Sequence, residues 1–143
     1  MSQTEIETLF TYVPPTSQTL PLFQQIKESE RMCYKQVFEV FSALPAPDAS
    51  EAFSPLFTVI TESVKDFAVQ VDALVPSGWG TAKELAVTAL VEARAAFNDA
   101  LMSYRAGEGE RMRLAYDLGM QSLIKARLLA CYGITFAYSG VAT

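Results

Sequence analysis

Four long stretches of the sequence carry apolar side chains at steps of three and four residues, and this spacing restricts the fold more than any other feature. Side chains at these steps lie on one face of an α-helix, so each stretch predicts an amphipathic helix that buries one side. The helices are predicted over residues 20–44, 50–75, 81–105 and 110–139. Thr19 is expected to cap the first helix, because its hydroxyl could accept a backbone N–H there.

Proline and glycine separate these stretches. The separators are Pro45-Ala46-Pro47, Pro76-Ser77-Gly78 and Gly107-Glu108-Gly109. Both residue types interrupt helices, and no stretch alternates apolar and polar residues as a half-buried strand does. A chain of 143 residues is long enough for one shared core. We therefore predict an all-α protein, a compact bundle of about four helices that forms a single domain over residues 1–143.

The first 19 residues are rich in threonine and proline and are predicted to form an extended arm ahead of the bundle. Val13 precedes Pro14, and Pro14 precedes Pro15. A residue that precedes proline favours extended backbone.

The composition excludes several classes of function. The chain has no histidine, so a Ser-His catalytic triad and histidine-based metal sites are excluded. The carboxylates are interpreted as solvated helix faces or caps. We expect no catalytic residue, no metal, no cofactor and no enzymatic activity. The net charge of −5 argues against non-specific binding to duplex nucleic acid, which needs a basic surface.

The two cysteines, Cys33 and Cys131, lie far apart and are expected to be reduced core residues. Residues 1–8 are polar and acidic, so no export signal is expected and a cytoplasmic location fits best. Residues 128–143 carry no charge, but this segment is too short for a membrane helix after Lys125 and Arg127. It is expected to be packed core or a subunit interface, with no membrane contact.

One arrangement could bind a nucleotide. Phe10 and Tyr12 present an aromatic pair on the arm, and Lys27, Arg31 and Lys35 follow at four-residue spacing on the first predicted helix. A tyrosine can stack on a nucleobase while a cation holds a phosphate. The alternative interpretation is that the two aromatic residues attach the arm to the bundle and the cations remain solvated.

The run Phe10-Thr11-Tyr12-Val13-Pro14-Pro15-Thr16, followed by Phe23-Gln24-Gln25-Ile26-Lys27-Glu28, resembles the start of the phage anti-CBASS sponge family. In that family Phe-Thr-Tyr-x-Pro-Pro is followed at this spacing by an aromatic residue and an Ile-Arg/Lys-Glu step. A second stretch, from Leu85 to Ala93 and through Phe97-Asn98-Asp99-Ala100, is similar to a later helix of the family.

The resemblance implies a small helical protein that forms oligomers, commonly hexamers, in the cytoplasm of an infected bacterium. Such proteins sequester the cyclic di- or trinucleotide messengers of CBASS immunity without cleaving them. It implies that Tyr12 stacks on a base and that Lys27 contacts a phosphate. Ser29 would add a hydroxyl contact. Phe10, Pro14 and Arg31, from the same motif and basic stripe, complete the candidate ligand-binding set.

The chain also departs from the family. Family members are typically shorter, and the two matched blocks cover only about a third of this chain. In one interpretation the second predicted helix is inserted between the blocks and the fourth is an addition. In the other, the second helix replaces the later family helix, and the third and fourth are an extension. Two other functions therefore stay open. The protein could be a non-enzymatic interaction module that docks a host protein through its apolar C-terminal helix, or a sponge for a cyclic ADP-ribose-type signal.

Overall fold

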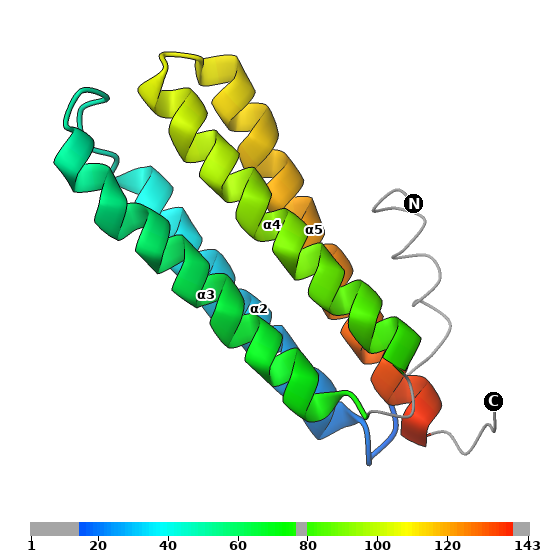
Figure 1. Ribbon diagram of the computed structural model, residues 1–143. Coiled ribbons are helices and arrows are strands. Elements are labelled where there is room, and N and C mark those ends of the chain that lie inside the picture. Colours follow the sequence, from blue (N-terminus) through cyan, green and yellow to red (C-terminus); the bar gives the residue numbers. More distant parts are fainter. Residues whose placement is uncertain (1–14, 77–79, 139–143) are drawn as a thin grey trace.

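The computed structural model describes residues 15–76 and 80–138. These residues form four long helices and one short 3-10 helix, and no strand occurs among them. The elements are α2 (Leu20–Ser42), η1 (Ser50–Ala52), α3 (Phe53–Leu74), α4 (Gly80–Arg105) and α5 (Gly109–Tyr138). The four long helices form a compact bundle, which confirms the predicted all-α class (Figure 1).

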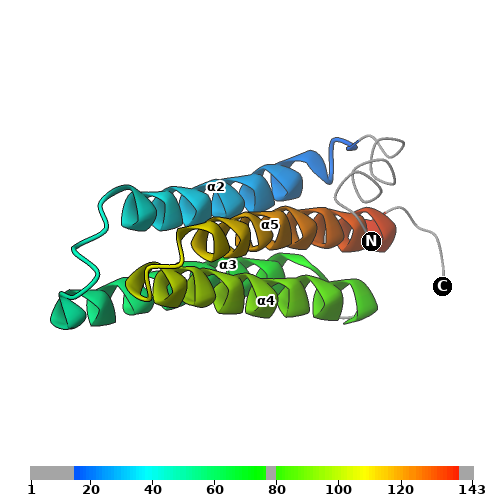
Figure 2. The same ribbon diagram turned by 90° about the horizontal axis from the view of Figure 1, so that it is seen from above.

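The bundle has two layers. In Figures 1 and 2, α3 and α4 lie side by side in one layer, and α2 and α5 lie behind them in the other. Each helix runs antiparallel to the helix that precedes it in the chain, and α5 returns to pack beside α2. The short connections between consecutive helices account for this up-and-down order.

Apolar side chains from all four helices meet in one core. The largest fully buried side chains include Ile26, Phe53, Ile60, Phe67, Leu90, Phe97, Leu101, Leu123 and Ile134. Removing this much apolar surface from water is the main term that stabilises the bundle.

Helices α4 and α5 pack most closely, because the side chains between them are small. The buried small residues are Ala86, Ala89, Ala93, Ala96 and Ala100 on α4, and Ala115, Gly119, Ser122, Ala126, Ala130 and Gly133 on α5. At Gly119 a methyl group would lie 2.5 Å from Cε1 of Phe97. Only glycine leaves room there for the Phe97 ring.

Two details of the first helix differ from the sequence prediction. Helix α2 ends at Ser42, two residues before the predicted end at 44, and Thr19 makes no side-chain capping bond to it. Instead, the Thr16 hydroxyl oxygen accepts the Thr19 N–H at 3.1 Å, and the Thr19 hydroxyl oxygen accepts the Thr16 N–H at 2.8 Å. This reciprocal pair closes a turn three residues earlier, so Thr16 takes the capping role that was assigned to Thr19.

The same turn shows that the prediction of an extended arm was wrong at the end of the arm. Residues 17–19 form a turn, whereas extended chain was expected as far as residue 19. The preference for extended backbone acts only on residues that precede a proline, and no proline follows Thr16, Ser17 or Gln18. The rest of the arm, residues 1–14, lies outside the described residues.

The uncharged end of the chain contributes to the core as far as the structure describes it. Between residues 128 and 138, the buried residues are Leu128, Ala130, Cys131, Gly133 and Ile134. None of the described helices is both long enough and apolar enough to cross a membrane.

Candidate functional site

Three of the predicted ligand-binding residues lie on α2, but they do not share one side of it. A helix turns by roughly 100° per residue, so Lys27 and Arg31 lie on the same side and Ser29 lies almost opposite them. Lys27 is exposed, and its charge acts on the Glu30 carboxyl and on the Cys131 thiol of α5. Lys27 therefore lies along the seam between α2 and α5.

An ion pair joins the two helices at this seam. The Arg127 Nε donates a hydrogen bond of 2.7 Å to Oε2 of Glu30, and both side chains are about four-fifths buried, at 22% and 21% exposed. Burial raises the pKa of Glu30, and the charges of Arg127 and Lys27 oppose that shift. The Arg127 terminal nitrogens make no hydrogen bond to another described residue, so they remain available beside Lys27.

Arg31 already has a partner on its own helix. Its guanidinium forms a two-pronged contact with the Glu28 carboxylate, in which Nε donates to Oε2 at 2.8 Å. The hydrogen bond from Arg31 lowers the pKa of Glu28. Both side chains are exposed, and a phosphate at Arg31 would compete with Glu28 for the guanidinium.

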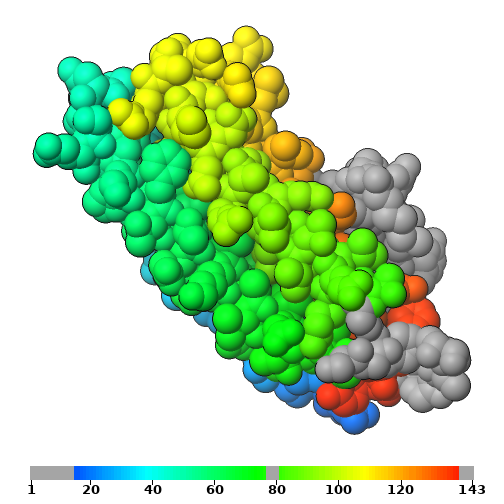
Figure 3. Space-filling model, in the orientation of Figure 1, coloured from blue at the N-terminus to red at the C-terminus, as the bar shows by residue number. Residues whose placement is uncertain are grey.

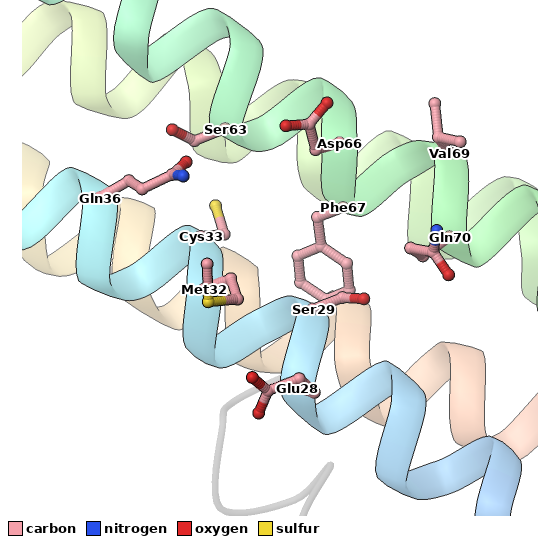
Figure 4. A pocket seen from close by; sticks show the side chains of 10 residues that line it. All are labelled: Glu28, Ser29, Met32, Cys33, Gln36, Ser63, Asp66, Phe67, Val69 and Gln70. Carbon is pink, nitrogen blue, oxygen red and sulfur yellow. The ribbon is translucent and has the colours of Figure 1, made fainter.

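Ser29 faces a different part of the molecule, a cavity of about 360 Å³ between α2 and α3 (Figure 4). Its hydroxyl donates a hydrogen bond of 3.0 Å to the backbone oxygen of Gln25. In Figure 4 the Cys33 thiol and the Phe67 ring point into the space between the two helices. The cavity is lined by Glu28, Ser29, Met32, Cys33 and Gln36 of α2 and by Ser63, Asp66, Phe67, Val69 and Gln70 of α3.

The charges around this cavity do not suit a phosphate. Its lining holds two carboxylates, on Glu28 and Asp66, and no lysine or arginine. Burial raises the pKa of the Cys33 thiol to about 12, and the charges of Glu30 and Asp66 add to the shift. A thiol that remains protonated is a poor nucleophile. The cavity therefore offers hydrogen-bonding groups for a neutral or cationic group, and Ser29 lies apart from the cations of the α2–α5 seam.

Neither the cavity nor the ion pair was predicted. Gln36, Ser63 and Gln70 are polar residues at the border of apolar helix faces, and no motif marks them. Glu30 and Arg127 are 97 positions apart, and only packing shows that they meet. The one local indication of this ion pair was the charge of Arg127, which stands next to an uncharged stretch.

Asn98, which belongs to the second stretch of resemblance, has an unusual environment. Its Oδ1 is buried and has no hydrogen-bond partner among the residues that the structure describes. A buried acceptor of this kind is costly. No group of three or more cysteine, aspartate or glutamate side chains in residues 15–76 and 80–138 is arranged to hold a metal ion.

The remaining site residues, Phe10, Tyr12 and Pro14, lie outside the described residues, so their positions relative to Lys27 are still a prediction. Comparison of the chain with protein families, with curated protein sequences and with solved structures found no match.

Proposed function

We propose that this protein binds and sequesters a cyclic oligonucleotide messenger without cleaving it, as a phage protein that blocks CBASS-type signalling in an infected bacterium. The observation that carries the proposal is the sequence from Phe10 to Thr16, which comes three residues before a helix whose exposed Lys27 has no ion-pair partner among the described residues. The segment supplies an aromatic residue, and the helix supplies a cation. These are the two contacts that a nucleotide needs.

Arg127 adds to this argument. Its Nε is held by Glu30, which orients the guanidinium, while Lys27 lies one helical turn before Glu30. Two cations at one seam can neutralise the phosphates of a cyclic dinucleotide even though the whole chain is acidic. In the proposal, Tyr12 stacks on a base, and Lys27 with Arg127 holds a phosphate. Sequestration then acts by mass action, so it needs tight binding and no catalytic group.

The resemblance also includes assembly. We propose a homo-oligomer, with six subunits as the first expectation, in which the arm and α2 of neighbouring subunits complete the site. A ligand bound between subunits would stabilise the assembly, because it binds only the assembled form.

The test is calorimetry and thermal shift with cyclic di- and trinucleotides, with linear dinucleotides and cyclic ADP-ribose isomers as comparison ligands. We expect a dissociation constant below about 1 µM for at least one cyclic nucleotide and recovery of that ligand intact after denaturation. Binding of a cyclic ADP-ribose isomer alone would mean that the protein sequesters a different class of messenger. Recovery of a hydrolysed ligand would mean that the protein is an enzyme, which contradicts the proposal.

Two variants test the assignment of the site. Tyr12→Ala and Lys27→Ala should each weaken binding by about tenfold or more, because each removes one class of contact. Arg113→Ala is the matched control, since Arg113 is exposed on α5 and forms no ion pair with another described residue. Wild-type affinity in both test variants, with helicity unchanged, would contradict the site.

One observation favours a second candidate, a protein-interaction module. Leu114 and Leu118 lie one turn apart on α5 and are 59% and 57% exposed, so this part of the helix presents apolar surface to solvent. The apolar C-terminal part of this helix is largely used inside the bundle, so these two residues are the better docking candidates. Capture of one specific host protein that is lost in Leu118→Lys, together with no binding of any cyclic nucleotide, would favour this function.

A further inference from the structure

A groove lies between α3 and α4. These two helices form the face that is turned toward the reader in Figures 1 and 3. Helices α2 and α5, which carry Lys27 and Arg127, lie behind this face, so the groove is separate from the site proposed above. It has a volume of about 210 Å³. Its lining consists of Thr61, Val64, Lys65 and Ala68 from α3 and Val87, Leu90, Val91 and Arg94 from α4.

The inner part of the groove is apolar. Val64 and Leu90 are buried in the core, at 4% and 1% exposed, and Ala68 and Val87 pack against that core from the groove side. Val91 lies at the rim and is half exposed. An apolar group that entered the groove would therefore lose water contact on both helical walls.

The charged residues of the groove are both cations, one on each wall. Lys65 and Arg94 are exposed, and neither makes an ion pair or a side-chain hydrogen bond with another described residue. The Lys83–Asp72 contact defines the antiparallel register of the two helices. In this register Arg94 lies level with Thr61, one helical turn from Lys65. Two cations and a hydroxyl thus gather at one part of the groove, and its lining holds no carboxylate.

We infer that this groove binds a small amphipathic anion, a single phosphate or carboxylate on a short apolar body. Like charges that face each other repel, and an anion between them offsets this repulsion by adding an attraction to each cation. A groove of about 210 Å³ has room for the several non-hydrogen atoms of a short apolar body. The ligand is a free small molecule and not a membrane, because Glu62 and Asp66, which flank Lys65 on α3, are exposed outside the groove lining and would meet a flat anionic bilayer but not a small ligand inside the groove.

The probe for this site is hexyl phosphate, titrated into the full-length protein by calorimetry and by amide chemical shifts. We expect saturable one-to-one binding below about 1 mM, with the largest shifts on α3 and α4 near the lining residues. Hexanol lacks the charge and inorganic phosphate lacks the apolar body, so each should bind at least about tenfold more weakly. If hexanol bound as tightly as hexyl phosphate, the two cations would have no role in binding. If hexyl phosphate showed no saturable binding, the inference of a binding site would be wrong.

Variants separate this site from a general attraction of anions to the protein. Lys65→Gln and Arg94→Gln should each lower the affinity for hexyl phosphate by about fivefold or more, because a charge-assisted hydrogen bond is lost. Arg113→Gln, on α5, is the control and should leave the affinity unchanged. Affinities equal to wild type in both groove variants would overturn the inference. Binding to phosphatidylglycerol vesicles without binding to hexyl phosphate would assign the surface to a membrane instead.

The result is distinguishable from that of the proposed function. Lys27→Ala should leave hexyl phosphate binding intact, and Lys65→Gln should leave cyclic nucleotide binding intact. If one variant abolished both activities, the two sites would be one, and the inference of a separate groove would be wrong.

Discussion

Gly119 shows how one side chain controls the closest contact in the bundle. A methyl group at this position would lie 2.5–2.7 Å from three atoms of the fully buried Phe97 ring. We expect Gly119→Ala to lower the free energy of unfolding by about 1–3 kcal/mol, because overpacking forces the ring or the helix to shift. Urea unfolding measures this difference.

Gly109→Ala is the control for this substitution. Gly109 begins α5, and a methyl group there would meet nothing within 4 Å. Gly109→Ala should change the free energy of unfolding by no more than about 0.5 kcal/mol. Because alanine has the higher helix propensity, a loss at Gly119 opposes the propensity effect, and similar losses in the two variants would show that the contact with Phe97 does not determine the effect.

The two buried cysteines make stability depend on alkaline pH. Burial raises the pKa of Cys33 to about 12 and that of Cys131 to about 11, from an ordinary value of 9.0. The folded state therefore holds these protons more tightly than the unfolded state. The resulting stabilisation is complete below about pH 9 and is lost as the pH rises through 11 and toward 12.

Urea unfolding at about pH 8 and about pH 10.5 tests this linkage. Wild-type protein should lose more stability between the two pH values than a variant that carries Cys33→Ala and Cys131→Ala. Equal losses would show that other groups, such as tyrosines and lysines, cause the whole pH dependence. A thiol reagent at the lower pH should react with the wild-type protein only after unfolding.

Between elements, the Glu30–Arg127 ion pair is one of the contacts that join α2 to α5. Removing either partner leaves a charge that is about four-fifths buried without its counter-charge. We expect Glu30→Gln and Arg127→Gln each to lower the free energy of unfolding by about 1–3 kcal/mol. The double variant should lose less than the sum of the two, since it leaves no unpaired charge. Strictly additive losses in a double-mutant cycle would show that the two side chains do not interact.

Tyr104 links α4 to the loop that follows α2. Its hydroxyl donates a hydrogen bond of 2.7 Å to the backbone oxygen of Pro45, and its ring lies 6.0 Å from that of Phe53. Tyr104→Phe should cost about 1 kcal/mol, because the ring contact stays and the hydrogen bond is lost. Tyr34→Phe is the matched control, since Tyr34 is exposed and stacks on Phe38 through its ring alone. Equal stability of the two variants would argue against the Tyr104 bond.

At the scale of the whole molecule, the two helical hairpins are packed unequally. Small side chains bring α4 and α5 into the closest contact of the bundle, whereas α2 and α3, the other hairpin, meet over a smaller interface, and α2 meets α5 over a still smaller one. Elements with fewer buried contacts open at a lower free energy. We expect backbone amides of α2 to exchange with solvent deuterium faster than amides of α4 between Ala89 and Leu101. Equal exchange rates in these segments would show that the bundle opens as one cooperative unit.

Much of the architecture could be predicted from the sequence because its signals are local. Apolar periodicity and the prolines and glycines between helices placed three of the four helix starts within one residue, and the second start at the 3-10 turn that leads into α3. The cap was misplaced, because Thr16 and Thr19 are equally suited to it and only the backbone turn selects between them.

The candidate site was predictable only in part. Lys27 and Arg31 follow from their spacing on one helix, and the same helical geometry places Ser29 on the other side. The partner of Glu30, the cavity beside Ser29 and the two cations of the α3–α4 groove arise between helices that are distant in sequence.

The sequence by itself thus determined the helices, their order and the common core, since each depends on side chains within a few turns of one another. The tertiary structure alone decided which charges meet and where hollows remain. That choice depends on the rotation and register of each helix against its neighbours, which result from the packing of the whole core.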